Sequence, residues 1–187
     1  MTRSRSDHYS EPPGTRGRGR MLARAVAILL AAALAAQLVR VAFAAGNPAS
    51  QAPDFALKES SGRNLRLSEY RSEVVAVAFW ASWCGACREQ LPVLEGLQQS
   101  LGPEGLRVLA VNFDEKPSVA QETAAAARVS FPVLLDAAGD VGRLYDVQEL
   151  PMVVLVDRTG RLRGSYAGSD AADGREIDRA VRALLAE

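Results

Sequence analysis

Cys84 and Cys87 are the residues of this chain best suited to covalent chemistry, and they are the only cysteines among its 187 residues. They follow an uninterrupted apolar run, residues 74–80, which is the pattern of a strand buried on both faces. A helix is expected next, so Cys84 stands where unpaired backbone N–H groups and the positive end of the helix dipole favour a thiolate. Because the thiolate is the nucleophile in disulfide exchange, we predict that Cys84 is the attacking residue.

The spacing between the two cysteines predicts the role of the second. In a Cys-x-x-Cys at the start of a helix, the first sulfur is expected to be exposed and the second to lie one turn inward. Cys87 is therefore predicted to resolve the mixed disulfide that Cys84 forms, so that the pair cycles between dithiol and disulfide.

Two other interpretations of the cysteine pair fit less well. A structural disulfide across so short a loop constrains the unfolded chain little. A zinc site needs about four ligands, whereas the chain offers two cysteines and one histidine, His8. We expect no metal and no cofactor other than the redox-active disulfide itself.

Four segments of the chain carry a family resemblance. They are Phe-Trp-Ala-Ser-Trp-Cys-Gly-Ala-Cys-Arg at residues 79–88, with Pro92 shortly after; Ala-Pro-Asp-Phe at 52–55; Phe-Pro-Val-Leu-Leu-Asp at 131–136; and Leu-Pro-Met-Val-Val-Leu-Val-Asp-Arg-Thr-Gly at 150–160. The first resembles the thioredoxin superfamily. Together they resemble the TlpA/ResA-like thiol-disulfide oxidoreductases, and the similarity spans about residues 50–187.

The expected elements agree with a thioredoxin-like α/β sandwich. Apolar runs predict central strands at residues 74–80, 106–113, 131–135 and 152–156, and an edge strand at 161–166. Helices are expected after Cys87, at 117–128, at 139–145 and at the C-terminus. Residues 52–57 and 64–67 indicate an N-terminal β-hairpin. The resemblance implies a central mixed β-sheet flanked by helices, with an inserted strand-helix after the 106–113 strand.

The resemblance also implies where a substrate docks. Pro151 is expected to be a cis-proline that faces the cysteines and offers neighbouring backbone groups to a substrate peptide. The docking residues are accordingly Trp83, Gly85, Ala86, Leu150 and Pro151. Trp80 ends the buried strand and is expected in the core.

Three positions depart from the family pattern. Ala78 stands where thioredoxin has a buried aspartate, and Gln90 stands where many ResA-like members have a glutamate, so neither position can relay a proton. Glu149-Leu150-Pro151-Met152-Val153 replaces a family-typical Gly-x-Pro-Thr-Thr. These changes concern pH dependence and substrate preference, not the dithiol.

The pattern of residues 1–45 indicates targeting segments rather than part of the folded domain. Residues 1–20 are a disordered basic tail, residues 21–45 a signal peptide or signal-anchor helix, residues 46–51 a linker, and residues 52–187 the thioredoxin-like domain. Small residues at Ala42 and Ala44 suit a cleavable signal peptide; an uncleaved anchor would span residues 26–45, although Arg40 interrupts them. Both alternatives predict an exported domain, periplasmic or anchored to the outer face of the inner membrane through residues 25–45.

Charge separates the targeting segment from the domain. Residues 1–45 hold seven arginines against Asp7 and Glu11, whereas the whole chain is neutral, so the remainder is mildly acidic. Nucleic-acid binding, for which a basic stripe is expected, is therefore disfavoured.

The predicted function is reduction of disulfides in exported client proteins. Gly85 and Ala86 replace the histidine associated with strongly oxidising members. The resemblance implies a membrane thiol electron donor of the CcdA/DsbD kind, and cytochrome c maturation as one setting. The alternative is a copper assembly or carrier module on the same fold, but such proteins carry Cys-x-x-x-Cys with a distant histidine. A peroxidase of the peroxiredoxin group needs Pro-x-x-x-Thr-x-x-Cys, which residues 77–84 do not supply.

Overall fold

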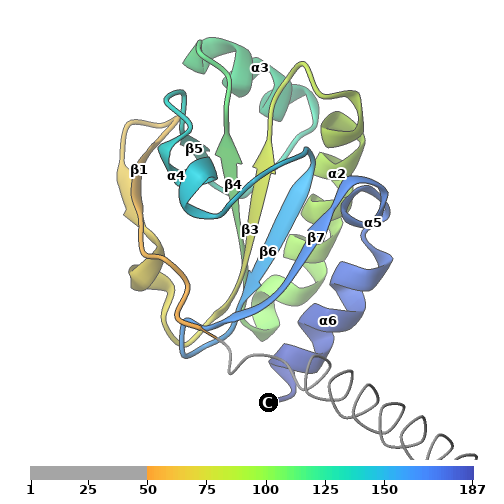
Figure 1. Cartoon of the computed structure of the whole chain (residues 1–187). Coiled ribbons are helices and arrows are strands. Elements are labelled where there is room, and N and C mark those ends of the chain that lie inside the picture. Colours follow the sequence, from red (N-terminus) through yellow and green to blue (C-terminus); the bar gives the residue numbers. More distant parts are fainter. Residues whose placement is uncertain (1–49) are drawn as a thin grey trace, which may run out of the picture. The chain divides into compact units, whose positions relative to one another are not determined.

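The computed structural model describes residues 50–187, apart from the side chains of residues 169, 170 and 172. These residues form one seven-stranded sheet with helices on its faces (Figure 1). The predictions for residues 1–20 and 21–45, and for most of the 46–51 linker, lie outside the described residues.

The sheet is mixed, as the resemblance implied. Its order is β2-β1-β5-β4-β3-β6-β7, in which β3, β4 and β5 are parallel and the other neighbours are antiparallel. The strands are β1 (Ala56–Glu59), β2 (Asn64–Arg66), β3 (Val74–Trp80), β4 (Leu106–Asn112), β5 (Val133–Leu135), β6 (Met152–Val156) and β7 (Leu162–Ala167).

Helices cover both faces of the sheet. The chain forms η1 (Leu67–Tyr70), α2 (Gly85–Leu101), η2 (Gly102–Glu104), α3 (Pro117–Ala126), α4 (Asp140–Leu144), α5 (Gly168–Asp173) and α6 (Arg175–Leu185). Residues of α2, α3 and α6 pack in one buried cluster, whereas α4 packs in the other. Between β4 and β6, where the resemblance implied an inserted strand and helix, the chain forms α3, β5 and α4.

Strand β3 lies inside the sheet and is buried along its whole length. Alternate residues point to opposite faces of a strand. Ala76, Ala78 and Trp80 accordingly belong to the cluster under α2, and Val77 and Phe79 to the cluster under α4. This double burial explains why the sequence of β3 is continuously apolar rather than alternating.

Two helices differ from the sequence-based expectation. Helix α3 ends at Ala126 rather than at Arg128, whose positive φ of 55° lies outside helical geometry. Helix α5 was not expected, because Gly-Ser-Asp-Ala-Ala-Asp shows no apolar stripe. Within residues 50–187, no helix combines the length and the apolar composition needed to cross a membrane.

Candidate active site

The turn between β3 and α2 places Cys84 at the start of the helix. Cys84 is the N-cap residue of α2, with an extended backbone, and its Sγ accepts a hydrogen bond from the backbone N–H of Cys87 at 3.1 Å. The sulfur therefore sits where the orphan donors of the helix N-terminus point, which is the setting that stabilises a thiolate. The expectation of a strand-to-helix turn at Cys84 is confirmed.

Cys84 and Cys87 are joined in a disulfide, with their Cα atoms 5.2 Å apart. Cys87 is completely buried, and Cys84 is only 9% exposed. The expectation of an exposed first cysteine was too strong, because the Cys84 sulfur lies against the first turn of α2 and is bonded there. The order of exposure is nevertheless as expected, because Cys84 keeps some exposed surface and Cys87 has none.

A cavity of about 500 Å3 opens beside Cys84. We call it the redox groove; its lining residues are Trp83, Cys84, Phe113, Val147, Gln148, Glu149 and Leu150. Trp83 is 71% exposed, whereas Trp80, three positions earlier, is fully buried. The two tryptophans thus divide as expected, Trp80 in the core and Trp83 on the surface beside the cysteine.

Strand β6 brings Leu150 and Pro151 to the end of the sheet where the cysteine turn lies. Met152 pairs with Phe79 of β3, so the residues just before β6 lie next to the end of β3 where the cysteine turn begins. The Leu150–Pro151 peptide bond is cis, and Pro151 is buried. Leu150 lines the redox groove, while Gly85 and Ala86 are exposed on the first turn of α2.

Comparison with known proteins fits this geometry. The model of the AhpC/TSA family matches residues 48–165. The chain belongs to the AhpC/TSA family. Within it, the chain is 32% identical over 120 residues to the thiol-disulfide oxidoreductase ResA of Geobacillus thermodenitrificans, covering 64% of this chain and 69% of that protein. It is 34% identical over 122 residues to the thioredoxin-like protein YneN of Bacillus subtilis, and the match covers 64% of this chain and 71% of that protein.

A solved structure from Chlorobium tepidum, assigned to the thiol:disulfide interchange protein DsbE, has the same fold. Its TM-score is 0.70 at 35% identity, covering 74% of this chain and 98% of that one. The protein is thus a thiol-disulfide oxidoreductase of the ResA/DsbE type, and its fold is thioredoxin-like. Among residues 50–187, no three His, Cys, Asp or Glu side chains are grouped so as to hold a metal ion.

Four residues that line the redox groove were not among the predicted docking residues: Phe113, Val147, Gln148 and Glu149. Phe113 follows β4, and Val147 lies in the loop after α4. A signal for Phe113 was present, because residues that follow neighbouring parallel strands meet at the same edge of a sheet. Val147 has no comparable signal, since its position depends on how α4 packs.

Gln90 occupies a buried position in α2, three residues after Cys87. Its Nε2 donates a hydrogen bond of 2.7 Å to the backbone oxygen of Ala171 in α5, and its Oε1 has no partner among the described residues. An amide does not titrate near neutral pH. Gln90 therefore links α2 to α5 in this AhpC/TSA member and supplies no acid or base.

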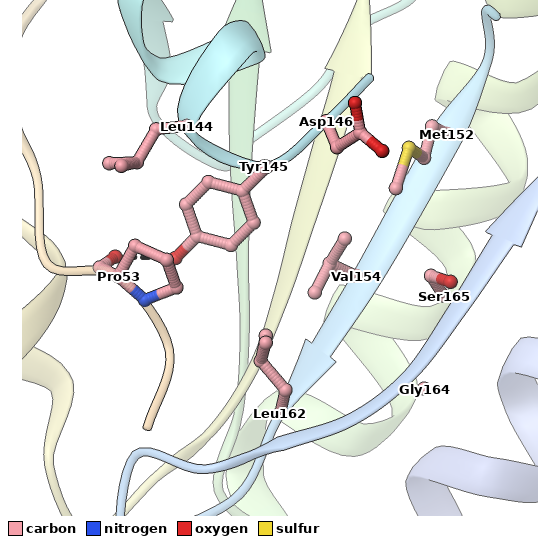
Figure 2. A pocket seen from close by; sticks show the side chains of 9 residues that line it. All are labelled: Pro53, Leu144, Tyr145, Asp146, Met152, Val154, Leu162, Gly164 and Ser165. Atoms are coloured by element: carbon pink, nitrogen blue, oxygen red, sulfur yellow. Dashed lines mark hydrogen bonds between the residues drawn. The ribbon is translucent and has the colours of Figure 1, made fainter. Parts of the chain in front are cut away.

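A second cavity, of about 360 Å3, lies over β6 and β7 (Figure 2). We call it the apolar groove; its lining residues are Pro53, Leu144, Tyr145, Asp146, Met152, Val154, Leu162, Gly164 and Ser165. The Tyr145 hydroxyl donates to the Pro53 carbonyl oxygen at 2.7 Å. Burial, with a smaller effect of Asp54, raises the pKa of Tyr145 above its ordinary value, so the hydroxyl stays neutral. The apolar groove contains no cysteine and no activated nucleophile.

Proposed function

We propose that the protein reduces disulfides in client proteins of an exported compartment, with Cys84 as nucleophile and Cys87 as resolving thiol. The observation that carries the proposal is the position of the Cys84 sulfur, which lies at the N-terminus of α2 and lines the redox groove while Cys87 is buried behind it. Similarity to proteins named thiol-disulfide oxidoreductase supports the same chemistry.

The reaction proceeds in two exchanges. In the dithiol form, the Cys84 thiolate attacks one sulfur of a client disulfide, which forms a mixed disulfide and releases the other client sulfur as a thiolate. The Cys87 thiolate then attacks the Cys84 sulfur, which forms the Cys84–Cys87 disulfide and releases the second client thiolate. The client gains two electrons and two protons, and the protein loses them.

In this proposal, the client protein binds in the redox groove. Trp83 offers a large exposed apolar surface, and Leu150 and Phe113 line the adjoining wall. Pro151 follows Leu150 directly, and Gly85 and Ala86 flank the sulfur on the helix side. A peptide that contacts these residues lies with its own sulfur beside Cys84.

Each catalytic cycle leaves the protein oxidised, so a second dithiol must restore it. We propose a membrane thiol donor of the CcdA/DsbD kind, and apocytochrome c during cytochrome c maturation as one client. We propose that the domain works in the periplasm or at the outer face of the inner membrane. The basic and apolar pattern of residues 16–45 supports this location.

The test is the reduction potential of the Cys84/Cys87 pair in the full chain, equilibrated with glutathione or dithiothreitol buffers. A value near or below about −250 mV, toward the thioredoxin end of the scale, supports a reductant. A value near about −120 mV, as in strong oxidants, would mean that the protein donates disulfides instead.

A further inference from the structure

Asp114 is a buried carboxylate next to the cysteine turn. It is 6% exposed and lies two positions after the last residue of β4. Its Oδ2 accepts a hydrogen bond from the backbone N–H of Ser82 at 3.0 Å, and its Oδ1 accepts one from the Ser82 hydroxyl at 2.8 Å. Ser82 lies between the end of β3 and Cys84. The Asp114 carboxylate therefore holds the short loop before Cys84 through two hydrogen bonds to Ser82.

The other side of Asp114 is fixed to the sheet through Asn112. The Asn112 Nδ2 donates to Asp114 Oδ2 at 2.8 Å, and the Asp114 backbone N–H donates to Asn112 Oδ1 at 2.9 Å. Asn112 is fully buried and pairs with Trp80 across β3 and β4. The loop is thus clamped to the last residue of the buried strand β4.

The charge of Asp114 is balanced by hydrogen bonds and not by a cation. No arginine or lysine of residues 50–187 forms an ion pair with it. Lys116 and Glu115 line the same hollow as Asp114 and Trp83, and both are exposed. A buried carboxylate without a paired cation is costly in free energy. Its contact with Ser82, two residues before Cys84, therefore calls for a functional explanation.

We propose that Asp114 is a positioning residue for Cys84, acting through Ser82, and that it favours the disulfide over the dithiol. The inference rests on disulfide exchange at Cys84, as proposed above. Two effects act in the same direction. When the disulfide opens, the clamp keeps Cys84 within reach of Cys87, which raises the effective concentration of one thiol at the other. The negative charge also opposes a Cys84 thiolate, which exists only in the reduced form.

The experiment equilibrates the full chain with glutathione buffers and measures the fraction of protein in the disulfide form. One oxidised glutathione converts the dithiol into the disulfide and leaves as two reduced glutathione molecules. Asp114→Ala should lower this equilibrium constant about tenfold, which corresponds to a potential about 30 mV more oxidising. Ser82→Ala, which removes one of the hydrogen bonds and keeps the charge, should lower it about threefold.

Asp136 supplies the matched control. It is also a buried aspartate at the end of a parallel strand, but its Oδ2 accepts the backbone N–H of Gly142 in α4 at 2.9 Å. Asp114→Ala and Asp136→Ala should both lower the melting temperature, but the equilibrium constant of Asp136→Ala should stay within twofold of that of the unmodified chain.

An equilibrium constant for Asp114→Ala within twofold of the unmodified chain would show that the clamp is only structural, and would overturn the inference. If Asp114→Ala does not fold, an unchanged constant for Ser82→Ala has the same meaning. Absence of any reversible couple in the unmodified chain is a different result: it refutes the proposed function, and the inference with it.

Discussion

The two ends of strand β6 have different surroundings: an open groove lies before the strand, and a hydrogen-bonded turn follows it. Before the strand, Glu149 and Leu150 line an open groove beside Cys84. After it, the carboxylate of Asp157 closes the turn into β7. Its Oδ1 accepts hydrogen bonds from the Thr159 N–H at 2.9 Å, the Thr159 hydroxyl at 2.7 Å and the Arg161 N–H at 3.0 Å.

This difference separates a reactive end from a structural end of the same strand. Burial alone would raise the pKa of Asp157, but the hydrogen bonds from Arg161, Thr159 and Arg163 outweigh it and lower the pKa to about 2. At the other end, the groove beside Cys84 is open. An open groove beside the Cys84 sulfur distinguishes the reactive end from the structural end.

The largest effect is expected from the cysteines at the reactive end. Cys87→Ser should accumulate mixed disulfides between Cys84 and client proteins in extracts of the exported compartment, because the resolving step is removed. Cys84→Ser should accumulate none, because Cys87 is fully buried. Non-reducing gel electrophoresis measures both variants, and equal trapping by the two would contradict the assigned roles.

At the structural end, Asp157→Asn should lower the free energy of unfolding by about 2 kcal/mol at pH 7, the equivalent of the depressed pKa. Because the folded pKa lies below the unfolded value, this stability is present above about pH 4 and is lost as the pH falls toward 2. Chemical denaturation at pH 7 and at pH 2 tests it, and the difference between the two proteins should nearly vanish at pH 2.

Asp140 provides the control for Asp157, because its pairing with Arg143 is on the surface. Asp140→Asn should change the free energy of unfolding by less than about 0.5 kcal/mol at either pH. A loss as large as that of Asp157→Asn would mean that charge, and not the turn hydrogen bonds, stabilises this domain.

A smaller effect is expected from substitution of Trp83. Leu144 of the apolar groove is its control, because both are large exposed apolar residues. Trp83→Ala should slow reduction of a protein disulfide about tenfold, the cost of losing a well-packed aromatic contact, while reduction of glutathione disulfide changes little. Leu144→Ala should leave both rates within twofold. Stopped-flow measurement with each substrate checks this, and equal slowing with glutathione disulfide would place Trp83 in the chemistry rather than in docking.

The sequence predicted the features of the site that depend on local pattern. The apolar run before the cysteines, their spacing and the helix that follows are all encoded within about 20 consecutive residues, so the strand, the N-cap position of Cys84 and the burial of Cys87 followed directly. The fold followed from the resemblance and from the order of apolar runs. The docking roles of Trp83, Gly85, Ala86, Leu150 and Pro151 remain predictions.

The features that escaped prediction depend on pairing between distant segments. Asp114 and Phe113 reach the cysteine turn because β4 lies parallel to β3, and Val147 reaches it through the packing of α4. Helix α5 is too short and too polar to show a period.

The antiparallel pairing of β6 with β3 also sets the order in which the site can appear during synthesis. Pro151 lies 64 positions after Cys87, and at about 5–20 residues per second it leaves the ribosome roughly 3–13 seconds later. During that interval the cysteine pair exists without the Leu150 wall of its groove. The groove beside Cys84 is therefore complete only after Leu150 has been synthesised.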